Sequence, residues 1–178
     1  MAKVVLLVRS FNRPDYLKDT LCSLLESDID ICTHRYIYDD GSTDTKVHEI
    51  LDADSEYTNV LGKEFIVLNG ERNVGCKSSY TNALERITDE CDFVCTVDND
   101  VNVTKDWIKT FLSVFTDAYS IFQTRNMLLT GFKPTNAHPH VIHKYPTFHT
   151  KSTCGGVSYF FHNEFKSYIK EKWGKGHL

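Results

Sequence analysis

The chain has 178 residues, of which 41% are hydrophobic and 25% are charged, and its formal net charge is −4. This composition is typical of a single globular domain and excludes a disordered or fibrous protein. The apolar run at the N-terminus stops at Arg9, which is too short for a signal peptide or a membrane span. We therefore expect a soluble cytoplasmic protein.

The cysteines and the charges are distributed unevenly. Six cysteines occur without a CxxC pair, which favours free, mostly buried thiols over disulfides or a zinc site. From Ile121 onward there are eight Lys or Arg and only two acids, and six of the eight histidines lie in this part. Such a segment can face the phosphates of a nucleotide or an anionic acceptor, although a plain solvated surface would have the same composition.

Apolar runs alternate with amphipathic stretches along the first 115 residues. The pattern predicts strands at 4–8, 35–38, 64–69 and 93–97, and helices at 14–25, 42–51, 77–87 and 104–115. Ser42 or Thr43 is expected to cap the second helix, and Thr104 the fourth. The alternation predicts an α/β fold in a single domain, with a mainly parallel central sheet and helices on both faces.

The remaining third has a weaker pattern. Residues 120–123 could form a short strand, and residues 125–153, which contain prolines and several histidines, are expected to be a long irregular segment. A strand entered through Gly155 and Gly156 and a helix at 163–173 complete the expected order of elements.

Polar side chains follow each of the four predicted parallel strands. They occupy 9–13, 39–44, 72–77 and 98–100. The carboxyl ends of parallel strands meet at one edge of a sheet, where ligands bind. Asp98 and Asp100, one residue apart, suit a hard cation such as Mg²⁺ or Mn²⁺ that would in turn hold phosphate oxygens. Taken alone, Asp-Asn-Asp could also be a simple polar turn.

With these motifs the chain resembles the family 2 type of nucleotide-sugar-dependent glycosyltransferase, which has the GT-A fold. The matching stretches are Val-Arg-Ser-Phe-Asn-Arg-Pro at 8–14, Asp-Asp-Gly-Ser-Thr-Asp at 39–44, Asn-Val-Gly at 73–75 with Asn82-Ala83 downstream, and Asp98-Asn99-Asp100. The resemblance implies that residues 1–120 are the donor-binding half. Residues 121–178 would be the acceptor-side part of the same GT-A domain, with Gly155 and Gly156 on the acceptor side.

The resemblance also implies roles for single residues. Asp40 would accept a hydrogen bond from a ring N–H of the nucleobase, Asp98 would bind the ribose or the water shell of the metal, and Asp100 would bind Mn²⁺ or Mg²⁺. His177 could complete the metal site. The full set implied for a nucleoside diphosphate sugar, a UDP sugar above others, is Arg9, Asn12, Arg13, Asp39, Asp40, Gly41, Arg72, Asn73, Gly75, Lys77, Asn82, Asp98 and Asn99.

The implied reaction is an inverting transfer to a hydroxyl group of a glycan, protein, lipid or modified DNA, and it needs a general base. The acid that this type of enzyme carries after the diglycine strand and its helix is missing before Leu178. Either the chain is truncated before its base, or another group replaces it. The candidates are Glu164, His162, His149, Asp117, His138, His140 and His143.

Two other functions fit part of the sequence. Val97-Asp98-Asn99-Asp100-Val101 resembles the nucleophile motif of HAD-like phosphohydrolases, although that motif normally opens the chain. The missing base would also suit a nucleotide- or sugar-binding module without turnover. Release of phosphate from a generic phosphomonoester would favour the phosphohydrolase, and nucleotide binding without transfer or hydrolysis of any donor would favour the binding module.

Overall fold

The computed structural model describes residues 2–52, 54–59, 63–131, 141–151 and 157–174. Its centre is a six-stranded sheet in the order β3-β2-β1-β4-β8-β5. Strands β3, β2, β1 and β4 are parallel, and β8 runs antiparallel to β4 and β5. The strands are β1 (Val4–Ser10), β2 (Cys32–Asp39), β3 (Ile66–Asn69), β4 (Phe93–Asp98), β5 (Leu128–Leu129) and β8 (Ser158–His162). The expected mainly parallel sheet is therefore confirmed.

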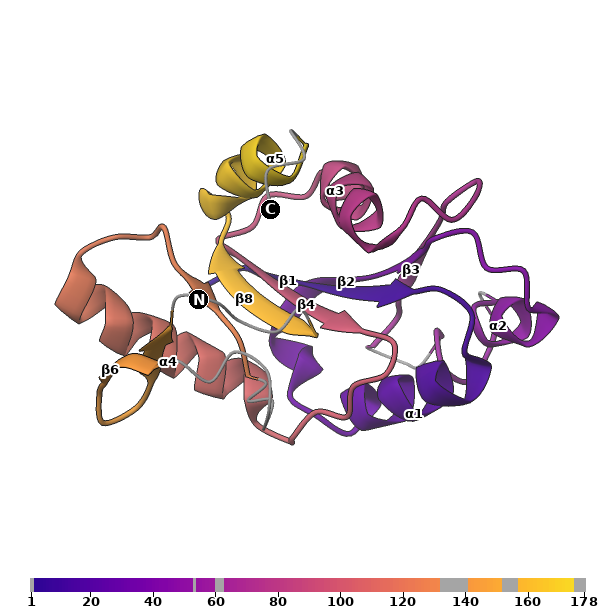
Figure 1. The fold of residues 1–178 in the computed structure, drawn as a ribbon. Coiled ribbons are helices and arrows are strands. Elements are labelled where there is room, and N and C mark those ends of the chain that lie inside the picture. Colours follow the sequence, from indigo (N-terminus) through magenta and orange to yellow (C-terminus); the bar gives the residue numbers. More distant parts are fainter. Residues whose placement is uncertain (1, 53, 60–62, 132–140, 152–156, 175–178) are drawn as a thin grey trace.

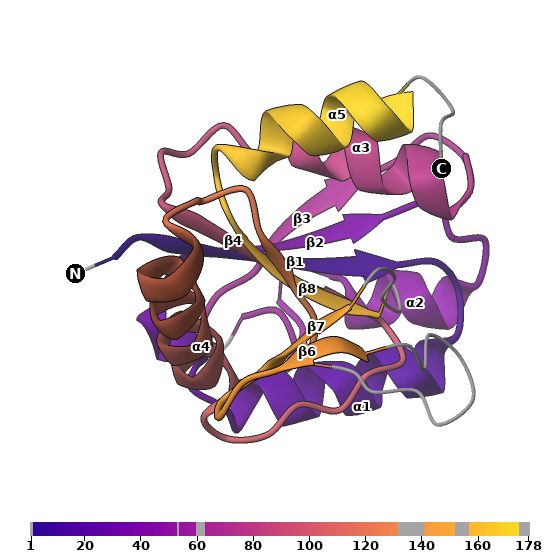
Figure 2. The same ribbon diagram turned by 60° about the vertical axis from the view of Figure 1, so that its left-hand side comes forward.

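Helices cover both faces of the sheet, as Figure 1 shows. One face carries α1 (Pro14–Leu25), α2 (Thr45–Ile50) and α4 (Trp107–Phe122), with a short 3₁₀ helix, η1 (Ile29–Ile31), after α1. The other face carries α3 (Cys76–Arg86) and α5 (Phe165–Gly174), which lie side by side in Figure 2. Among the described residues, no helix is long and apolar enough to cross a membrane.

The central strand explains why the N-terminal apolar run is continuous. Every residue of β1 is buried. Val4, Leu6 and Val8 belong to the core cluster that includes residues of α1, α2 and α4, whereas Val5 and Leu7 belong to the cluster on the α3 and α5 side. A strand covered on both faces has no solvent-facing side, so it shows no alternation of apolar and polar residues.

The two predicted helix caps are wrong. Helix α2 is capped by Asp44, whose Oδ1 accepts a hydrogen bond from Lys46 N at 3.0 Å. Ser42 is engaged with Asp39 instead. Helix α4 begins at Trp107 and not near Thr104. Its first N–H groups donate to the distant carboxylate of Asp28, an interaction that no local sequence pattern reveals.

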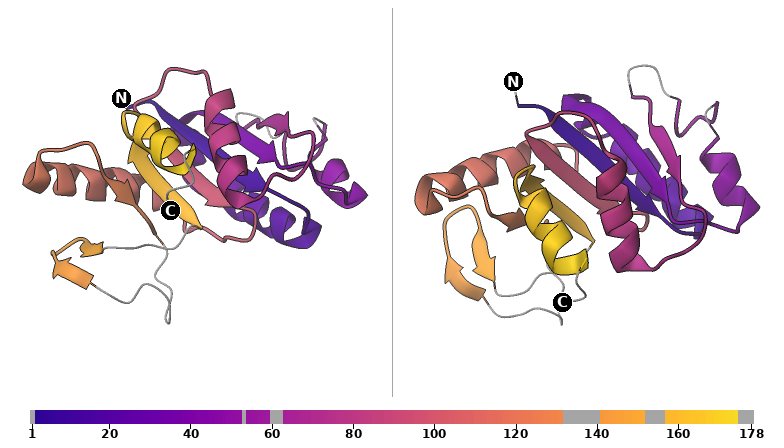
Figure 3. Two further views of the ribbon diagram at one scale, coloured as in Figure 1. Left: turned by 45° about the horizontal axis from the view of Figure 1, so that its top comes forward. Right: turned by 90° about the horizontal axis from the view of Figure 1, so that it is seen from above.

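The segment after α4 also differs from the prediction. Residues 120–122 are the last turn of α4 and not a strand. The expected irregular segment contains β5 and an antiparallel hairpin of β6 (Val141–Lys144) and β7 (His149–Lys151), visible in Figure 3. Tyr145 and Phe148 of this hairpin pack on Phe122, with ring centroids 5.6 and 6.1 Å away. The hairpin is therefore anchored at the C-terminal end of α4.

Candidate active site

The carboxyl ends of the parallel strands bring the four polar segments together. Strand register places Arg9 beside Asp98, and Ser10 beside Asp39. A cavity of about 310 Å³ lies at this edge of the sheet. It is lined by Arg9, Ser10, Phe11, Arg13, Asp40, Asn73, Cys76, Ser79, Asp98, Asn99 and Asp100. The cavity therefore draws on the loops after β1, β2, β3 and β4.

Arg9 is a buried cation beside this cavity, with 7% of its surface exposed. Its guanidinium forms an ion pair with Asp98, and Nη1 donates to the carbonyl oxygen of Cys76 at 3.0 Å. The guanidinium carbon also lies 4.7 Å from the centre of the Tyr80 ring. Burial raises the pKa of Asp98 above its usual range, while Arg9 acts against that shift. Arg9 is thus held in place from three sides.

The second carboxylate of the motif, Asp100, has a more exposed partner. Arg13 Nη1 donates to Asp100 Oδ2 at 2.8 Å, and the Arg13 side chain is 60% exposed. Exposed ion pairs contribute little to stability, about 0–1 kcal/mol. Arg13 can therefore leave Asp100 for another anion in the cavity at little cost.

The two neighbouring aspartates after β2 have different environments. Both carboxylate oxygens of Asp39 accept hydrogen bonds from Ser42, one from its N–H at 2.8 Å and one from its hydroxyl at 2.5 Å. Asp39 therefore stabilises the turn. Asp40 lines the cavity, and its Oδ2 accepts a hydrogen bond from Val74 N at 3.2 Å. Burial raises the pKa of Asp40.

Asn12 joins three of the loops. Its N–H donates to Ser42 Oγ at 2.7 Å, and its Oδ1 accepts from the N–H groups of Thr43 and Asp44 at 3.0 and 3.2 Å. Its carbonyl oxygen accepts from Asn99 Nδ2 at 3.0 Å. Asn12 and the buried Asn99 thus connect the loops that follow β1, β2 and β4 by hydrogen bonds.

Gly41 allows two loops to approach each other closely. It has a φ of 72°, and a Cβ at this position would lie 2.5 Å from the Cα of Arg72. A side chain cannot be accommodated at that distance without moving the backbone. A second cavity of about 360 Å³ lies beside this turn, and Gly41, Ser42, His48 and Asn69 are among its lining residues.

Unsatisfied polar atoms concentrate at the first cavity. Among the described residues, four buried side-chain atoms have no hydrogen-bond partner: Arg9 Nε, Ser10 Oγ, His34 Nδ1 and Asp40 Oδ1. Three of them belong to residues that line this one cavity. Buried polar groups are normally paired, so Arg9, Ser10 and Asp40 retain unused hydrogen-bonding capacity beside this cavity.

Comparison with known proteins identifies the family. The family model described as "Glycosyl transferase family 2" matches residues 6–174. The chain belongs to this family. No curated protein is detectably similar to the chain in sequence.

Solved structures of glycosyltransferases share the GT-A fold with this family 2 chain. This chain is 25% identical to the structure of S. aureus TarS over 66% of the chain's length, with a TM-score of 0.51. It matches the structure of TarS residues 1–349 over 96% of the chain's length, with 18% identity and a TM-score of 0.60. GalNAc-T7 matches over 72% with 15% identity and a TM-score of 0.56. The chain spans only 20%, 49% and 22% of these structures, respectively.

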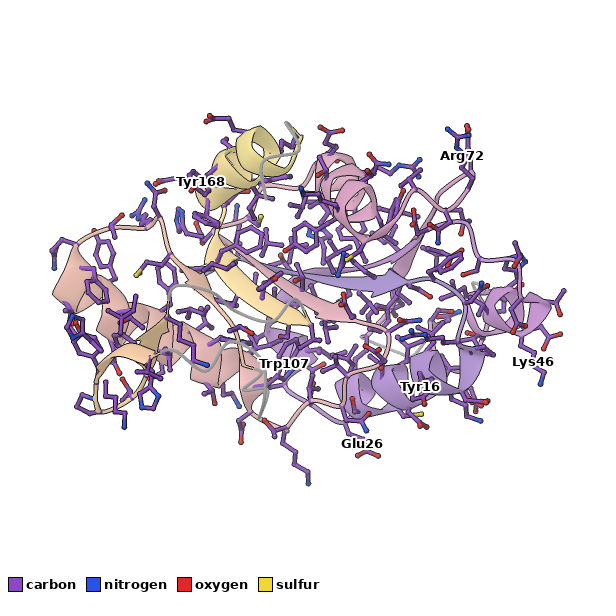
Figure 4. The ribbon with its side chains drawn as sticks, in the orientation of Figure 1. Tyr16, Glu26, Lys46, Arg72, Trp107 and Tyr168 are labelled. Carbon is purple, nitrogen blue, oxygen red and sulfur yellow. The ribbon has the colours of Figure 1, made fainter. Side chains whose placement is uncertain are left out.

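Several donor residues implied by the family resemblance do not line the cavity. Arg72 is exposed, and its side chain projects away from the sheet in Figure 4. Lys77 lies in the first turn of α3 and Asn82 lies further along it. Gly75 precedes α3 with a φ of 82°, and its N–H donates to Asn73 Oδ1 at 2.8 Å. Asn73 itself lines the cavity.

Some predicted site residues lie outside the described residues. These are Gly155, Gly156, His177, His138 and His140. The described chain resumes at Val157, whose carbonyl oxygen accepts a hydrogen bond from Asp98 N at 2.9 Å. The residue that follows the diglycine therefore lies directly beside the metal-binding motif implied by the resemblance.

The structure does not bring the candidate bases to the cavity. His162 contacts Phe93, the first residue of β4, with ring centroids 5.3 Å apart, whereas Asp98 is the last residue of that strand. Five residues of β-strand span roughly 16 Å. Glu164 pairs with Arg125 at 2.9 Å beside His162. His162 and Glu164 thus occupy the amino edge of the sheet, opposite the cavity.

The remaining described candidates lie towards the same amino edge. Phe115 of α4 contacts Phe93, so the second half of α4, which contains Asp117, lies near the start of β4. His143 and His149 belong to the hairpin that packs on Phe122, seven residues beyond Phe115. None of these described candidates lines the cavity.

The donor set fits a divalent cation that binds together with a diphosphate. Asp98 and Asp100 line the same cavity, and among the described residues no group of three or more His, Cys, Asp or Glu could hold a metal unaided. Mg²⁺ typically binds through one or two carboxylates, substrate phosphates and water. Two carboxylates are therefore sufficient for this mode of binding.

Four cavity residues were not among the predicted site residues: Ser10, Phe11, Cys76 and Ser79. Ser10, the last residue of β1, and Phe11 belong to the motif at 8–14, so their position in that motif was an available signal. Cys76 and Ser79 lie one helical turn apart on α3. Cys76 lies within the segment expected at 72–77 but is neither charged nor an amide, whereas Ser79 lies beyond that segment, so the strand-end criterion could not find Ser79.

Proposed function

We propose that this chain forms the donor site of a metal-dependent glycosyltransferase that transfers a sugar from a nucleoside diphosphate sugar to an acceptor hydroxyl, with inversion at the anomeric carbon. The observation that carries the proposal is the coincidence, around one cavity, of two carboxylates, two arginines and the unpaired buried atoms of Ser10 and Asp40. Family 2 membership gives the class of reaction.

The nucleobase is assigned to Asp40. Its unpaired Oδ1 can accept a hydrogen bond from a ring N–H, and its buried position makes such a bond favourable. Phe11, which is 37% exposed, offers an aromatic face in the same cavity. Uracil has a ring N–H between two carbonyl groups and so satisfies an acceptor of this kind.

The diphosphate is assigned to the side of the cavity that contains Asp98, Asp100 and Arg13. Asp98 and Asp100 would hold Mn²⁺ or Mg²⁺, which when bound neutralises the charge that develops on the departing nucleoside diphosphate. Arg13 can turn from Asp100 to a phosphate oxygen, because its present ion pair is exposed. Arg9 keeps Asp98 oriented for ribose or metal-bound water and opposes the rise of the Asp98 pKa that burial causes.

The relatives suggest which nucleotide and metal to test first. TarS residues 1–349 have been solved with UDP and with UDP-GlcNAc, and GalNAc-T7 with UDP, GalNAc and Mn²⁺. UDP, UDP-GlcNAc, GalNAc and Mn²⁺ are ligands of TarS or GalNAc-T7 in those structures. For this chain, UDP with Mn²⁺ is the first combination to examine.

A thermal-shift panel of UDP, GDP, CDP, ADP and dTDP, each with Mn²⁺, Mg²⁺ or EDTA, tests the donor site. UDP with Mn²⁺ should raise the melting temperature, since a ligand that binds only the folded state stabilises it. EDTA should remove the effect. If no nucleotide stabilises the protein with either metal, the proposal fails. Where a UDP sugar binds, NMR of the hydrolysed or transferred sugar reports the anomeric configuration, and retention would contradict inversion.

A nucleotide-binding module without turnover is the second candidate. It is favoured by the placement of His162 and Glu164 at the opposite edge of the sheet from the cavity. Calorimetric binding of UDP with Mn²⁺, with neither transfer nor slow hydrolysis of any UDP sugar, would support this candidate over the enzyme.

A further inference from the structure

Arg13 combines an anchored backbone with an exposed side chain. It directly precedes α1, and its carbonyl oxygen accepts a hydrogen bond from Leu17 N at 3.0 Å. Asn12 and Arg13 have φ angles of 50° and 58°, a conformation that residues other than glycine seldom adopt. The hydrogen bonds of Asn12 to the loops after β2 and β4 hold this conformation in place. The Arg13 side chain can therefore change its partner without a change in the backbone.

The two arginines of the cavity differ in how firmly they are held. The guanidinium of Arg9 is buried and contacts Asp98, the carbonyl oxygen of Cys76 and the ring of Tyr80. The side chain of Arg13 is 60% exposed, and that of its partner Asp100 is 34% exposed. Since exposed ion pairs contribute little to stability, Arg13 is the arginine that can exchange one anion for another.

The charge balance of the cavity makes such an exchange useful. The lining contains three carboxylates and two guanidinium groups, and both guanidinium groups are already paired with carboxylates. A diphosphate that enters this lining therefore needs an added cation, a released guanidinium, or both. Transfer of Arg13 from Asp100 to the diphosphate supplies the guanidinium and leaves the Asp100 carboxylate available to a cation.

Arg13 and a divalent cation also compete for one carboxylate. Arg13 Nη1 donates to Asp100 Oδ2 at 2.8 Å, and Asp100 is the residue assigned to the metal in the proposed donor site. A guanidinium at this distance repels a second cation at the same carboxylate. As long as Arg13 is paired with Asp100, it therefore weakens the binding of a metal ion there.

We propose that Arg13 is a positioning residue that couples metal binding to nucleotide binding. Paired with Asp100, Arg13 opposes the metal; paired with a phosphate oxygen, it releases Asp100 to the metal and stabilises the nucleotide. Each ligand then raises the affinity of the other by the same factor. Direct contact between metal and diphosphate also couples the two, so the contribution of Arg13 is the part that a substitution removes. This inference rests on the proposed function, from which it takes the positions of metal and diphosphate.

The first test measures Mn²⁺ binding without nucleotide, by electron paramagnetic resonance of the free ion. Mn²⁺ should bind Arg13→Gln roughly two- to fivefold more tightly than wild type, because an exposed pair of this kind competes only weakly. Arg13→Lys keeps the charge and should stay near wild type. A role of Arg13 in maintaining the loop would instead make the glutamine variant bind Mn²⁺ more weakly. Unchanged or weaker Mn²⁺ binding by Arg13→Gln overturns the proposal.

Lys109 provides the matched control. Its side chain is 61% exposed, and its Nζ lies 3.2 Å from Asp106 Oδ1 in a pair outside the cavity. Lys109→Gln removes one exposed positive charge from the protein, as Arg13→Gln does, but should leave Mn²⁺ binding unchanged. An equal gain in both variants would assign the effect to net charge and overturn the proposal.

The second test measures the coupling itself, as the ratio of the Mn²⁺ dissociation constants without and with saturating UDP. Arg13→Gln should lower this ratio by roughly tenfold, because the variant gains Mn²⁺ affinity and loses a charge-assisted bond to the diphosphate. If wild type shows coupling and Arg13→Gln keeps the same ratio, the proposal fails while the proposed function stands. If wild type shows no mutual effect of UDP and Mn²⁺, the metal-dependent donor site fails, and this inference with it.

Discussion

Arg9 and Asp98 form an ion pair between the neighbouring strands β1 and β4, while Arg13 and Asp100 form a second pair just beyond the ends of the same strands. The side chain of Arg9 is 8% exposed and that of Arg13 is 60% exposed. The two pairs have the same chemistry but opposite burial. They therefore allow the contribution of burial to be measured within one site.

Arg9→Ala should destabilise the protein by about 3 kcal/mol or more, because it leaves Asp98 without its partner in a mostly buried position. Arg13→Ala should cost less than about 1 kcal/mol. Urea denaturation of both variants checks this difference. If the two substitutions destabilise the protein equally, burial of the Arg9–Asp98 pair does not increase its contribution to stability.

Asp40→Ala should weaken UDP binding by roughly ten- to a hundredfold, since it removes the acceptor assigned to the nucleobase. Binding of inorganic pyrophosphate should change by less than about twofold, because no base is present. Calorimetry with both ligands measures the difference. Equal losses for the two ligands would place Asp40 at the diphosphate instead.

The neighbouring Asp39 is the matched control for that experiment. Its carboxylate is fully engaged with Ser42, so Asp39→Ala should lower the free energy of unfolding by about 1–3 kcal/mol through loss of the turn. Any weakening of ligand binding should then affect UDP and pyrophosphate alike.

The sequence was sufficient to predict the four parallel strands and the edge of the sheet at which the cavity lies. The continuous apolar run of β1 predicts a strand buried on both faces, and the carboxyl ends of parallel strands must meet at one edge. The sequence could not separate Asp39 from Asp40, because their roles depend on contacts with Ser42 and Val74. It also could not show that α4 is capped by Asp28, about 80 residues earlier in the chain.

The C-terminal third was predicted less well for physical reasons. Ile121 and Phe122 suggest a strand, but they form the last turn of α4, where Phe122 packs against the β6–β7 hairpin. Proline and histidine in the hairpin region give no clear period-two pattern. The base candidates were chosen by residue type, and the antiparallel direction of β8 is what places His162 at the amino edge.

Asp100→Asn should abolish the dependence of nucleotide binding on the metal. Wild type should bind UDP about tenfold or more tightly with Mn²⁺ than with EDTA, whereas the variant should give similar affinities under both conditions. Asp106→Asn is the control, because Asp106 is an exposed aspartate paired with Lys109 outside the cavity. A variant at Asp100 that keeps the full Mn²⁺ effect would remove this residue from the metal site.

Gly41→Ala should destabilise the protein and disturb the loop after β3. The added Cβ would lie 2.5 Å from Arg72 Cα, and the φ of 72° is unfavourable for alanine. Gly75→Ala is the comparison, because its φ is 82° but its Cβ would meet nothing within 4 Å. Backbone strain alone costs about 1–3 kcal/mol, so Gly41→Ala should exceed Gly75→Ala in denaturation experiments.

His162 should make stability fall in mild acid. Burial lowers the pKa of His162 below its ordinary value of 6.5, and the nearby Arg125 acts in the same direction, against Glu164 and Asp92. The folded state therefore binds this proton less readily than the unfolded state does. The resulting stability is present above pH 6.5 and is lost as the pH falls below that value.

Urea denaturation at pH 7.5 and pH 5.5 measures this effect. His162→Gln should reduce the loss of stability between the two pH values relative to wild type, whatever its absolute stability. His143→Gln, at an exposed histidine on β6, should keep the wild-type difference. If His162→Gln shows the same loss as wild type, the pH dependence arises from other groups and the packing of His162 on Phe93 and Phe115 does not oppose its protonation.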